Sequence, residues 1–491
     1  MNRKHILAIA GTVFVAVGVV AFIIMHRPRV DAYANVLPRQ LKAIVRIDPQ
    51  QLVSEAHLSA SDQVQLLRRL VGADDAGRTG IDMARPLFAF VSSSGDMGAV
   101  ARVDDADMLT SYLGELQARG HATPVSRQRD LSWTLVDGQW LMAFDADKAL
   151  VMGPAVATDD YLRSLMTQLM RQPRSDSGLT SDLYLDLATR HAPLVATATA
   201  AMLPPSLQTS LRSLFPDADP ATLRLMAEAH ADGNVLALDC EVASSAEGFG
   251  QSLAGLDSLL RPISGHLTAH AGEAPLLWLC ASVDGSRLLE MLRRSEEARY
   301  VLILLNAVAD VDAIIRDIDG DVAVELARGA SPSASLPPLM FTARLRDGAS
   351  GFREAPYWLT SAAKIGGYDL RQTSPTDFVF SSSDVSLRFG TRGGLLYAST
   401  SDALTLRPDG AGARGYVSSH RDAISGNRLY ATLDVAALDL STWAYAPLAS
   451  PLVRVAERVE LQMPEVGRLR LRVVAPPSVN IARSLIFPAT D

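Results

Sequence analysis

Apolar residues along the chain follow strand-like and helix-like spacings in turn. Residues 43–47 predict a strand, and Asp48 then supplies an N-cap for a helix. Asp105 or Asp107 has the same place before residues 108–116, where apolar side chains recur every three or four positions. The pattern predicts a repeated unit made of a strand, a turn carrying aspartate, and a helix, and it explains these aspartates as helix caps.

Hairpin signals lie between these units. Residues 133–144 hold two apolar runs around Asp137 and Gly138, a dipeptide that favours a tight turn. The counterpart segments in the second half of the chain are 378–380, 385–389 and 395–399. Because strands adjoin both helices and hairpins, we predict an α+β fold with a mixed or mostly antiparallel sheet, covered on one face by helices.

The sequence also repeats itself at a nearly constant offset. Residues 44–52 resemble residues 280–288, which lie 236 positions later. Three further pairs follow in the same order, at offsets of 242, 245 and 248: 101–105 with 343–347, 144–151 with 389–396, and 185–188 with 433–436. We therefore predict a tandem duplication with halves at 38–268 and 269–491, joined within the turn-rich residues 261–275.

The N-terminus contains an uncharged and mostly apolar run of twenty residues, 6–25, with positive charges on both sides. At about 1.5 Å per residue such a helix spans a hydrocarbon core of roughly 30 Å. We predict a cytoplasmic tail at 1–5, a single transmembrane anchor at 6–25 and a linker at 26–37. The bulk of the chain would then face the periplasm from a bacterial inner membrane. Cleavage near residues 32–34 is the alternative.

The net charge and the cysteine content limit the expected binding partners and the expected disulfides. The chain has 491 residues, with 46 Lys and Arg against 54 Asp and Glu, which gives a net charge of -8. Because phosphate binding needs a concentrated positive field, nucleic acid is not an expected partner. Cys240 and Cys280 both fall in strand-like runs. They are either two buried thiols or, in an oxidising compartment, one disulfide between adjacent strands.

Two short motifs match known catalytic or cofactor sites in residue type and spacing but lack the sequence context that those sites need. Gly410, Gly412 and Gly415 match a dinucleotide-binding glycine pattern, but no buried strand leads into them and no amphipathic helix follows. Ser361 and Lys364 have the helical spacing of a serine–lysine pair, yet the accompanying Lys-Thr-Gly motif is absent from the sequence. A loop and an exposed helix end explain them better.

Two other motifs resemble metal sites. Asp317, Asp319 and Asp321 begin like a calcium loop, but the glycine and the twelfth position do not fit, so we predict a turn before a strand. His266 and His270 have the spacing of helical metal ligands without an intervening glutamate. We therefore assign no catalytic, cofactor or metal residue.

Three segments carry a family resemblance: residues 37–52, 80–90 and 99–104. Here the chain resembles a Bacteroidetes envelope family known only as domain of unknown function 4836, together with a related 3352-type group. The resemblance implies an envelope location and supplies no catalytic residues. Members of that family are typically lipoproteins, whereas this chain has no cysteine near its N-terminus to carry a lipid.

These features favour a membrane-anchored periplasmic protein that binds a ligand or scaffolds a partner through a surface or cleft between duplicated halves. Its partners would be the membrane and an envelope protein or small ligand. An envelope hydrolase with dispersed catalytic residues is one alternative, and a lipid or peptide carrier is another. A pocket with a Ser or carboxylate bonded to His would favour the hydrolase, and a broad apolar groove would favour the carrier.

Overall fold

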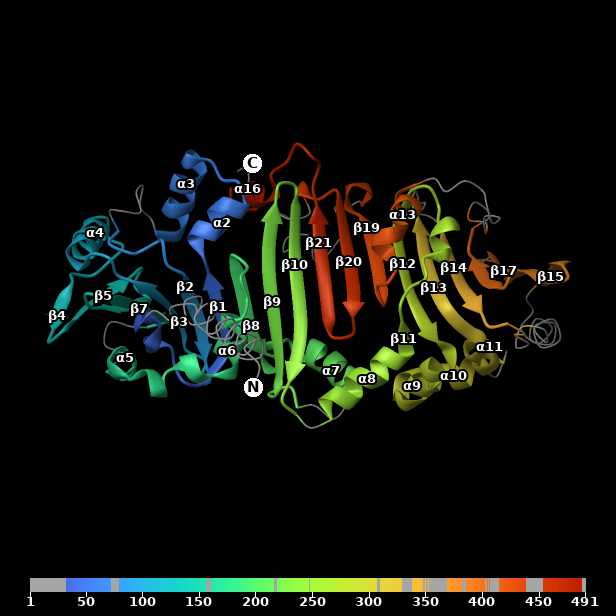
Figure 1. Ribbon diagram of the computed structural model, residues 1–491, viewed down its shortest axis with the longest axis horizontal. Coiled ribbons are helices and arrows are strands. Elements are labelled where there is room, and N and C mark those ends of the chain that lie inside the picture. Colours follow the sequence, from blue (N-terminus) through green and yellow to red (C-terminus); the bar gives the residue numbers. More distant parts are fainter. Residues whose placement is uncertain are drawn as a thin grey trace, which may run out of the picture. The chain divides into compact units, whose positions relative to one another are not determined.

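The structure is a computed structural model, shown in Figure 1. It describes residues 32–71, 79–155, 160–215, 219–246, 248–306, 310–328, 338–347, 349, 352, 369–381, 386–401, 404, 406, 415–438 and 454–487. The contacts divide the chain into two compact units: unit 1 is Met1–Pro49 with Leu67–His191, and unit 2 is Gln50–Leu66 with Ala192–Asp491. The boundary predicted near residue 268 falls inside unit 2 and stays a prediction.

Unit 1 is built on an antiparallel sheet. Its strands are β1 (Leu41–Ile47), β2 (Leu87–Ser92), β3 (Met97–Arg102), β4 (Ser126–Gln128), β5 (Leu131–Val136), β6 (Trp140–Phe144) and β7 (Lys148–Gly153). Hydrogen bonds place them in the order β1-β2-β3-β7-β6-β5-β4. The Asp137–Gly138 hairpin is confirmed: both residues have positive φ, +47° and +68°, between β5 and β6.

One face of this sheet is covered. Ile44, Phe88, Val100 and Leu150 point to it and are buried. The cover consists of short helices η1 (Ala32–Val36), η3 (Arg174–Asp176) and η4 (Gly178–Thr180) and of α5 (Asp160–Arg171) and α6 (Asp182–Ala188). The ring of Phe88 lies 6.1 Å from those of a tyrosine in η1 and a tyrosine in α6. Paired apolar positions therefore anchor these helices to one side of the sheet.

A single helix, α4 (Ala106–Ala118), follows β3 and packs on the other face. The side chain of Asp105 accepts hydrogen bonds from the backbone N–H groups of Asp107 and Met108, each at 2.9 Å. This satisfies two of the unpaired donors of the first turn, so the predicted cap is confirmed at Asp105.

Unit 2 has a longer antiparallel sheet. Its strands are β8 (Leu194–Thr199), β9 (Leu223–Asp232), β10 (Val235–Ser244), β11 (Leu260–Arg261), β12 (Pro275–Asp284), β13 (Ile318–Ala327), β14 (Leu339–Leu345), β15 (Asp369–Ser374), β16 (Asp377–Ser381), β17 (Ser386–Arg392), β18 (Leu395–Ser399), β19 (Leu429–Asp434), β20 (Arg458–Glu465) and β21 (Arg468–Val474). Their order is β8-β9-β10-β21-β20-β19-β12-β13-β14-β18-β17-β16-β15, and β11 pairs with one end of β12.

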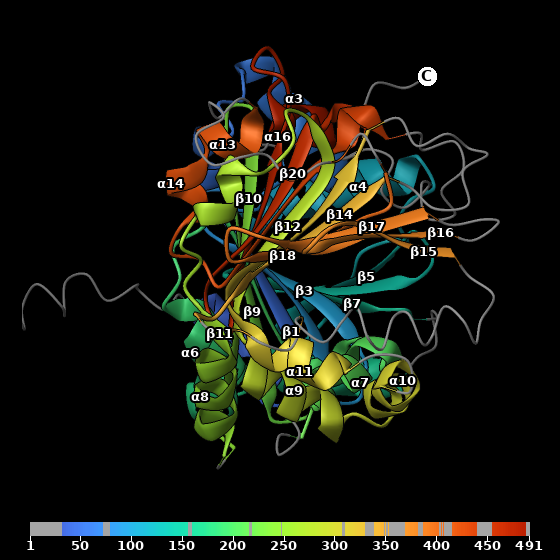
Figure 2. The same ribbon diagram turned by 90° about the vertical axis from the view of Figure 1, so that its right-hand side faces the viewer.

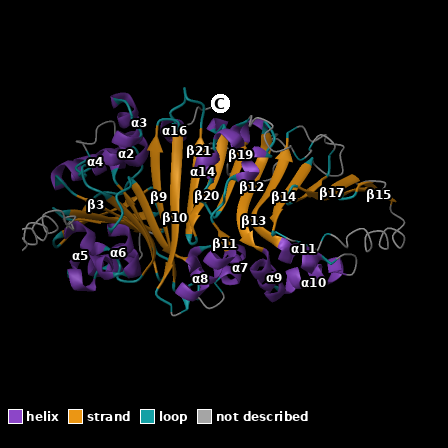
Figure 3. Cartoon of the chain, turned by 45° about the vertical axis from the view of Figure 1, so that its right-hand side comes forward, coloured by secondary structure: helices purple, strands orange, loops and turns teal. Residues whose placement is uncertain are grey.

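Helices lie mainly along one edge of unit 2, at the ends of the strands (Figures 1 and 2). They are α7 (Pro205–Leu214), α8 (Phe249–Leu259), α9 (Gly285–Arg294), α10 (Glu296–Asn306) and α11 (Val311–Asp317). The shorter α13 (Tyr416–Ser419), α14 (Arg421–Ile424), η5 (Ala200–Met202), η6 (His266–Ala269) and η7 (Val435–Ala437) complete the described helices of its strand-bearing part (Figure 3). Trp278, Cys280 and Tyr430 lie in its core, under η6, α13 and α14.

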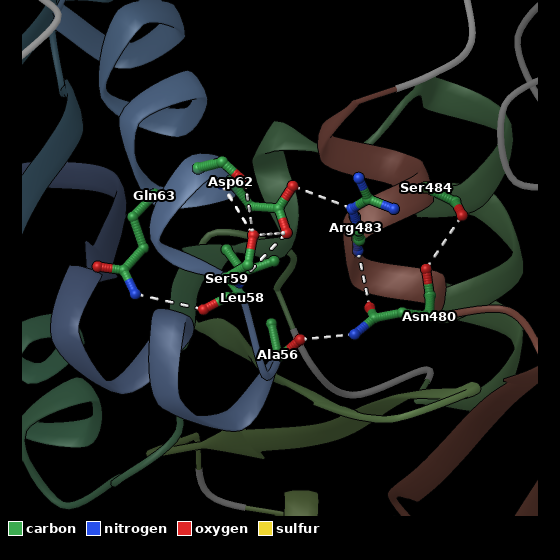
Figure 4. Close-up of polar contacts among 9 residues, drawn as sticks. Ala56, Leu58, Ser59, Asp62, Gln63, Asn480, Arg483 and Ser484 are labelled. Atoms are coloured by element: carbon green, nitrogen blue, oxygen red, sulfur yellow. Dashed lines mark hydrogen bonds and ion pairs between the residues drawn. The ribbon is translucent and has the colours of Figure 1, made fainter.

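The segment after β1 belongs by its contacts to unit 2. It contains α2 (Pro49–Glu55) and the start of α3 (Ala60–Val71), and it meets the C-terminal helix α16 (Ile481–Ile486) (Figure 4). The carboxylate of Asp62 accepts hydrogen bonds from the hydroxyl of Ser59 at 2.7 Å and from Nε of Arg483 at 2.9 Å. The Asn480 side-chain amide also donates to the carbonyl of Ala56 at 2.8 Å. Residues more than 400 positions apart are thus joined.

The predicted α+β class with a mostly antiparallel sheet is confirmed in both units. The predicted anchor at 6–25 lies outside the described residues, and none of the described helices combines the length and the hydrophobicity that a membrane span requires. One repeat pair is wrong: residues 185–188 form part of helix α6, whereas 433–436 end strand β19 and enter η7. Short strings of apolar residues around an aspartate occur in helices and strands alike, so that match carried no structural information.

Candidate functional site

The second face of the unit 1 sheet is apolar but only partly covered. Its positions are set by register: Val45 pairs with Ala89, Ala89 with Ala99, and Ala99 with Val151, so these side chains form one row across four strands. We call the following set the open face: Ala43, Val45, Leu87, Ala89, Val91, Ala99, Ala101 and Val151. All are intermediate or exposed, in contrast to the buried residues of the opposite face. A half-covered antiparallel sheet normally carries polar side chains on its solvent side.

A pocket of about 940 Å³ lies over the open face. Its floor is rich in alanine, whose small side chain leaves the space that a larger residue would fill. One wall comes from α4, through Leu109, Tyr112, Leu113 and Leu116. Those four side chains also pack with the core at the β6 and β7 end of the sheet, which fixes the wall in place. The volume falls within the usual range of small-molecule sites, about 300–1,000 Å³.

Polar groups gather at the rim of this pocket. Arg119, His121 and Asp137 line it and are each more than half exposed at the side chain. Nδ1 of His121 lies 2.8 Å from Oδ1 of Asp137, and the backbone N–H of Asp137 donates to the carbonyl of His121 at 2.8 Å. Arg119 is ion-paired with Glu115 at 3.6 Å. The rim therefore offers cationic and anionic groups to water beside an apolar interior.

One ionisable side chain lies deeper. Tyr112 is buried, and this burial raises the pKa of its phenol, against the opposing effect of the nearby Arg119. Its hydroxyl therefore stays protonated at neutral pH. A protonated phenol can donate a hydrogen bond but does not act as a base, so the interior of the pocket is suited to binding.

A second hollow of about 940 Å³ lies elsewhere in unit 1, beside α5. Serines 92–94, Gln168 and Gln172 are among its lining residues. This lining is more polar than the floor of the first pocket. Because specific binding sites are mostly apolar with a few placed polar groups, the pocket over the open face is the better candidate.

The alternative of a disulfide between Cys240 and Cys280 is not borne out by the structure. Cys240 and Cys280 are free, the first half-buried and the second buried. They lie on β10 and β12, and strands β21, β20 and β19 separate these two. At about 4.8 Å per strand the gap is roughly 19 Å, whereas disulfides need Cα atoms within about 7 Å. Burial raises the pKa of both thiols, which disfavours the thiolate form that makes a cysteine reactive.

The structure gives the metal-like motifs structural roles. The rings of His266 and His270 lie 5.9 Å apart around η6, and the described residues contain no group of three or more His, Cys, Asp or Glu able to hold a metal ion. Asp319 pairs with Arg261, and the buried Asp321 accepts hydrogen bonds from the backbone and hydroxyl of Ser264, at 3.0 and 2.7 Å. These partners hold a connection to the sheet in place.

The remaining motifs cannot be placed. Ser361, Lys364, Gly410 and Gly412 lie outside the described residues. Gly415 is described and precedes α13, a four-residue helix. Sequence reasoning missed the pocket itself, although the run of alanines and valines at 87–101 and the apolar side of the helix at 108–116 carried its two surfaces. Nothing in the sequence joins His121 to Asp137, because they meet only through the pairing of the segment after α4 with the end of β5.

Fold and site together define an antiparallel α+β protein with an apolar pocket over one sheet face. The model of the family described as domain of unknown function DUF4836 matches residues 33–410. The chain therefore belongs to this family, as its sequence resemblance implied.

Comparison with solved structures finds three crystal forms of TP0453. Forms I, IV and III are 8%, 8% and 7% identical to this chain, cover 49%, 43% and 44% of it and 89%, 81% and 80% of TP0453, and each have a TM-score of 0.26. Values this low support no conclusion about a shared fold or function. No functionally curated protein matches the chain.

Proposed function

We propose that this protein binds the acyl chain of a lipid, or a similarly elongated apolar ligand, in the pocket of unit 1. The observation that carries the proposal is the open face: an apolar sheet surface, floored by alanines and walled by α4, that the described fold leaves accessible. Burying apolar surface is favourable by roughly 25 cal/mol per Å². A ligand that covers this face gains that energy without displacing any part of the fold.

The chemistry of the open face favours an acyl chain over a peptide. A peptide brings backbone N–H and C=O groups, each of which costs free energy when buried without a partner. The floor is made of alanine, valine and leucine side chains, which offer no such partner. An acyl chain needs none, and its polar end could stay at the rim near Arg119 and His121, in contact with water.

The pocket contains only part of the catalytic group that the hydrolase alternative requires. A His–Asp pair is present at the rim, but acyl transfer also needs a nucleophile next to the histidine. The described residues that line the pocket include no serine or cysteine. His121 and Asp137 are also both well exposed, and their contacts attach the segment after α4 to the β5–β6 turn, beside the bridge between Ala122 and Val136, which explains them structurally.

We further propose that the chain is a single-pass envelope protein, anchored by residues 6–25 with its bulk in the periplasm. The apolar run in the sequence supports this, and lipid would then be available at the site of anchoring.

The tandem duplication is also part of the proposal. The order β12-β13-β14-β18-β17-β16-β15 in unit 2 has the same connectivity as β1-β2-β3-β7-β6-β5-β4 in unit 1, which supports a common origin. Three of the four sequence pairs fall on corresponding strands: 44 and 280 on β1 and β12, 101 and 343 on β3 and β14, and 150 and 395 on β7 and β18.

A ligand site between the predicted halves has less support. Strand β10 of the first half pairs with β21 of the second through seven registered residue pairs, from Val235 with Val474 to Glu241 with Arg468. The two predicted halves thus share a continuous ladder at this point. The carrier proposal rests instead on a pocket within unit 1.

The test uses the full chain in its own membranes and a fatty acid with a diazirine in its acyl chain. After illumination and trypsin digestion, we expect the label on peptides 79–102 and 103–119, which carry the floor and the α4 wall. Replacing Ala99→Trp fills the pocket from an exposed floor position and should remove most of this label. Ala146→Trp, in an exposed turn of the same unit, should not. Absence of label from both peptides, or equal labelling of Ala99→Trp, would refute the proposal.

A further inference from the structure

Helix α10 in unit 2 has its apolar residues on the outside. Five large apolar side chains are exposed: Tyr300, Val301, Ile303, Leu304 and Leu305, at 64%, 51%, 62%, 54% and 47% of their surface. Among the described large side chains of this helix, Leu302 alone is buried. A surface helix of a soluble protein normally has the reverse arrangement, so this face indicates a partner that is apolar.

The wider edge of unit 2 has the same character. Helices α7 to α11 lie together at one set of strand ends (Figures 1 and 3). Exposed Met202 and Leu207 lie at η5 and α7, and exposed Met291 lies on α9, next to α10. Two other exposed large apolar residues among the described part of unit 2 lie outside these helices: Val64 in the segment after β1 and Leu469 on β21. The exposed apolar residues are therefore concentrated along one edge.

We propose that α10 and this edge dock on the surface of a lipid bilayer. Charge supports this occupant. Arg293 and Arg294 end α9, and Arg299 follows near the start of α10; Arg293 is paired with Asp312 of α11. Arg294 and Arg299 remain exposed beside Glu296. Cations and a tyrosine next to an apolar stretch are the arrangement of interfacial helices, in which arginine meets lipid phosphate and tyrosine lies at the headgroup level.

The size of the apolar face is better suited to lipid than to a second protein. The exposed parts of the five side chains add up to roughly 500 Å², whereas a stable protein–protein interface buries about 800 Å² on each partner. A bilayer sets no such threshold, because each apolar residue that enters it contributes separately. The proposal concerns unit 2 and is independent of the pocket in unit 1. It uses the proposed anchor only as the reason that a bilayer is near.

The experiment reconstitutes the full chain in nanodiscs that contain a phospholipid with a diazirine in its acyl chain. We expect strong labelling of the tryptic peptide 300–316, which carries most of α10. Ile303→Asp and Leu304→Asp place a charge on the exposed face and should lower that labelling at least about fivefold, because a carboxylate is costly in the acyl region. Val64→Asp, at an exposed apolar site elsewhere in unit 2, is the matched control and should leave it unchanged.

The readouts separate this proposal from the others. Label on residues 6–25 reports the anchor, and label on peptides 79–102 and 103–119 reports the pocket, so either can fail while α10 is labelled. Arg294→Gln should weaken labelling of peptide 300–316 in nanodiscs with anionic phosphatidylglycerol more than in neutral ones. An unlabelled peptide 300–316, or crosslinked dimers through α10 in place of lipid adducts, would overturn the proposal.

Discussion

The sheet of unit 1 and the β12–β18 part of the unit 2 sheet have the same strand connectivity but differ in the size of the side chains on one face. When β1 is matched to β12 at Ile44 and Cys280, strand register gives these corresponding positions: Ala43 with Leu279, Val45 with Ala281, Ala89 with Val322, Val91 with Val324, and Val151 with Leu396. In three of these pairs the side chain of unit 2 is the larger one, in one pair it is the smaller, and in one pair the two are identical. The open face of unit 1 thus carries mostly smaller side chains, whereas on the corresponding face of unit 2 Leu288 of α9 and Ile314 of α11 belong to the same core as Leu396.

The covered faces differ in polarity. In unit 1, Phe88 pairs across the strands with Arg46 and is buried among aromatic rings. The corresponding position in unit 2 is Asp321, which pairs with Ser282 and is equally buried. The carboxylate is tolerated because Ser264 donates two hydrogen bonds to it. One position of the same framework can therefore be filled by hydrophobic packing or by a satisfied polar group.

We expect the largest loss of stability from a substitution at Phe88, the aromatic residue of the two corresponding positions. Phe88→Ala removes a buried ring that contacts both η1 and α6, so we expect a loss of about 3–5 kcal/mol in the free energy of unfolding. Urea unfolding of the full chain measures it, with Phe88→Leu as the conservative control that should lose less. A loss below about 1 kcal/mol would mean that this position does not anchor the covered face.

A substitution at Asp321, the polar residue of the two corresponding positions, should cost less stability. Asp321→Ala leaves the backbone N–H and hydroxyl of Ser264 without their acceptor and should cost about 1–3 kcal/mol in the same measurement. Asp321→Asn keeps an acceptor oxygen and should recover most of that loss. Equal losses for the two variants would show that charge, and not hydrogen bonding, is what the position supplies.

Exchanging residues between the two sheets tests the pocket directly. Ala43→Leu combined with Ala89→Val introduces the residues of unit 2 into the floor of unit 1. Labelling by the photoreactive fatty acid should fall about tenfold, equivalent to about 1.4 kcal/mol of binding free energy. Ala146→Leu is the matched surface control. If the double variant is labelled as strongly as the wild type, the volume of the floor does not control binding.

The sequence predicted the parts of this comparison that depend on local pattern. The strand at 43–47, the cap at Asp105 and the turn at Asp137 each follow from a few neighbouring residues, and all three were confirmed. The strand order and the open face depend on pairing between residues far apart, which a single sequence does not encode visibly. Cys240 and Cys280 show the same limit: both were placed in strands, but their separation across the sheet became known only from the pairing.

The helices that follow β1 and β12 give the last and smallest contrast. The start of α3, the second helix after β1, is fixed to α16 by Asp62, whereas α10, the second helix after β12, presents apolar residues to the outside. Hydrogen bonds from Ser59 and then from Arg483 lower the pKa of Asp62 below its ordinary value of 3.8. A carboxyl whose pKa is lowered on folding stabilises the folded state above its unfolded pKa, and this contribution is lost as the pH falls through the folded pKa.

We therefore expect Asp62→Asn to be less stable than the wild type at neutral pH, with the difference shrinking once the pH falls below about 3.8. The urea midpoints of the two proteins, compared at neutral and acidic pH, measure this. Asp232→Asn, whose side chain is 95% exposed, serves as the matched control. The contact between Asp62 and Arg483 joins α3 to α16. If the difference in urea midpoint between the wild type and Asp62→Asn did not change with pH, Asp62 would stabilise this contact through packing and not through its charge.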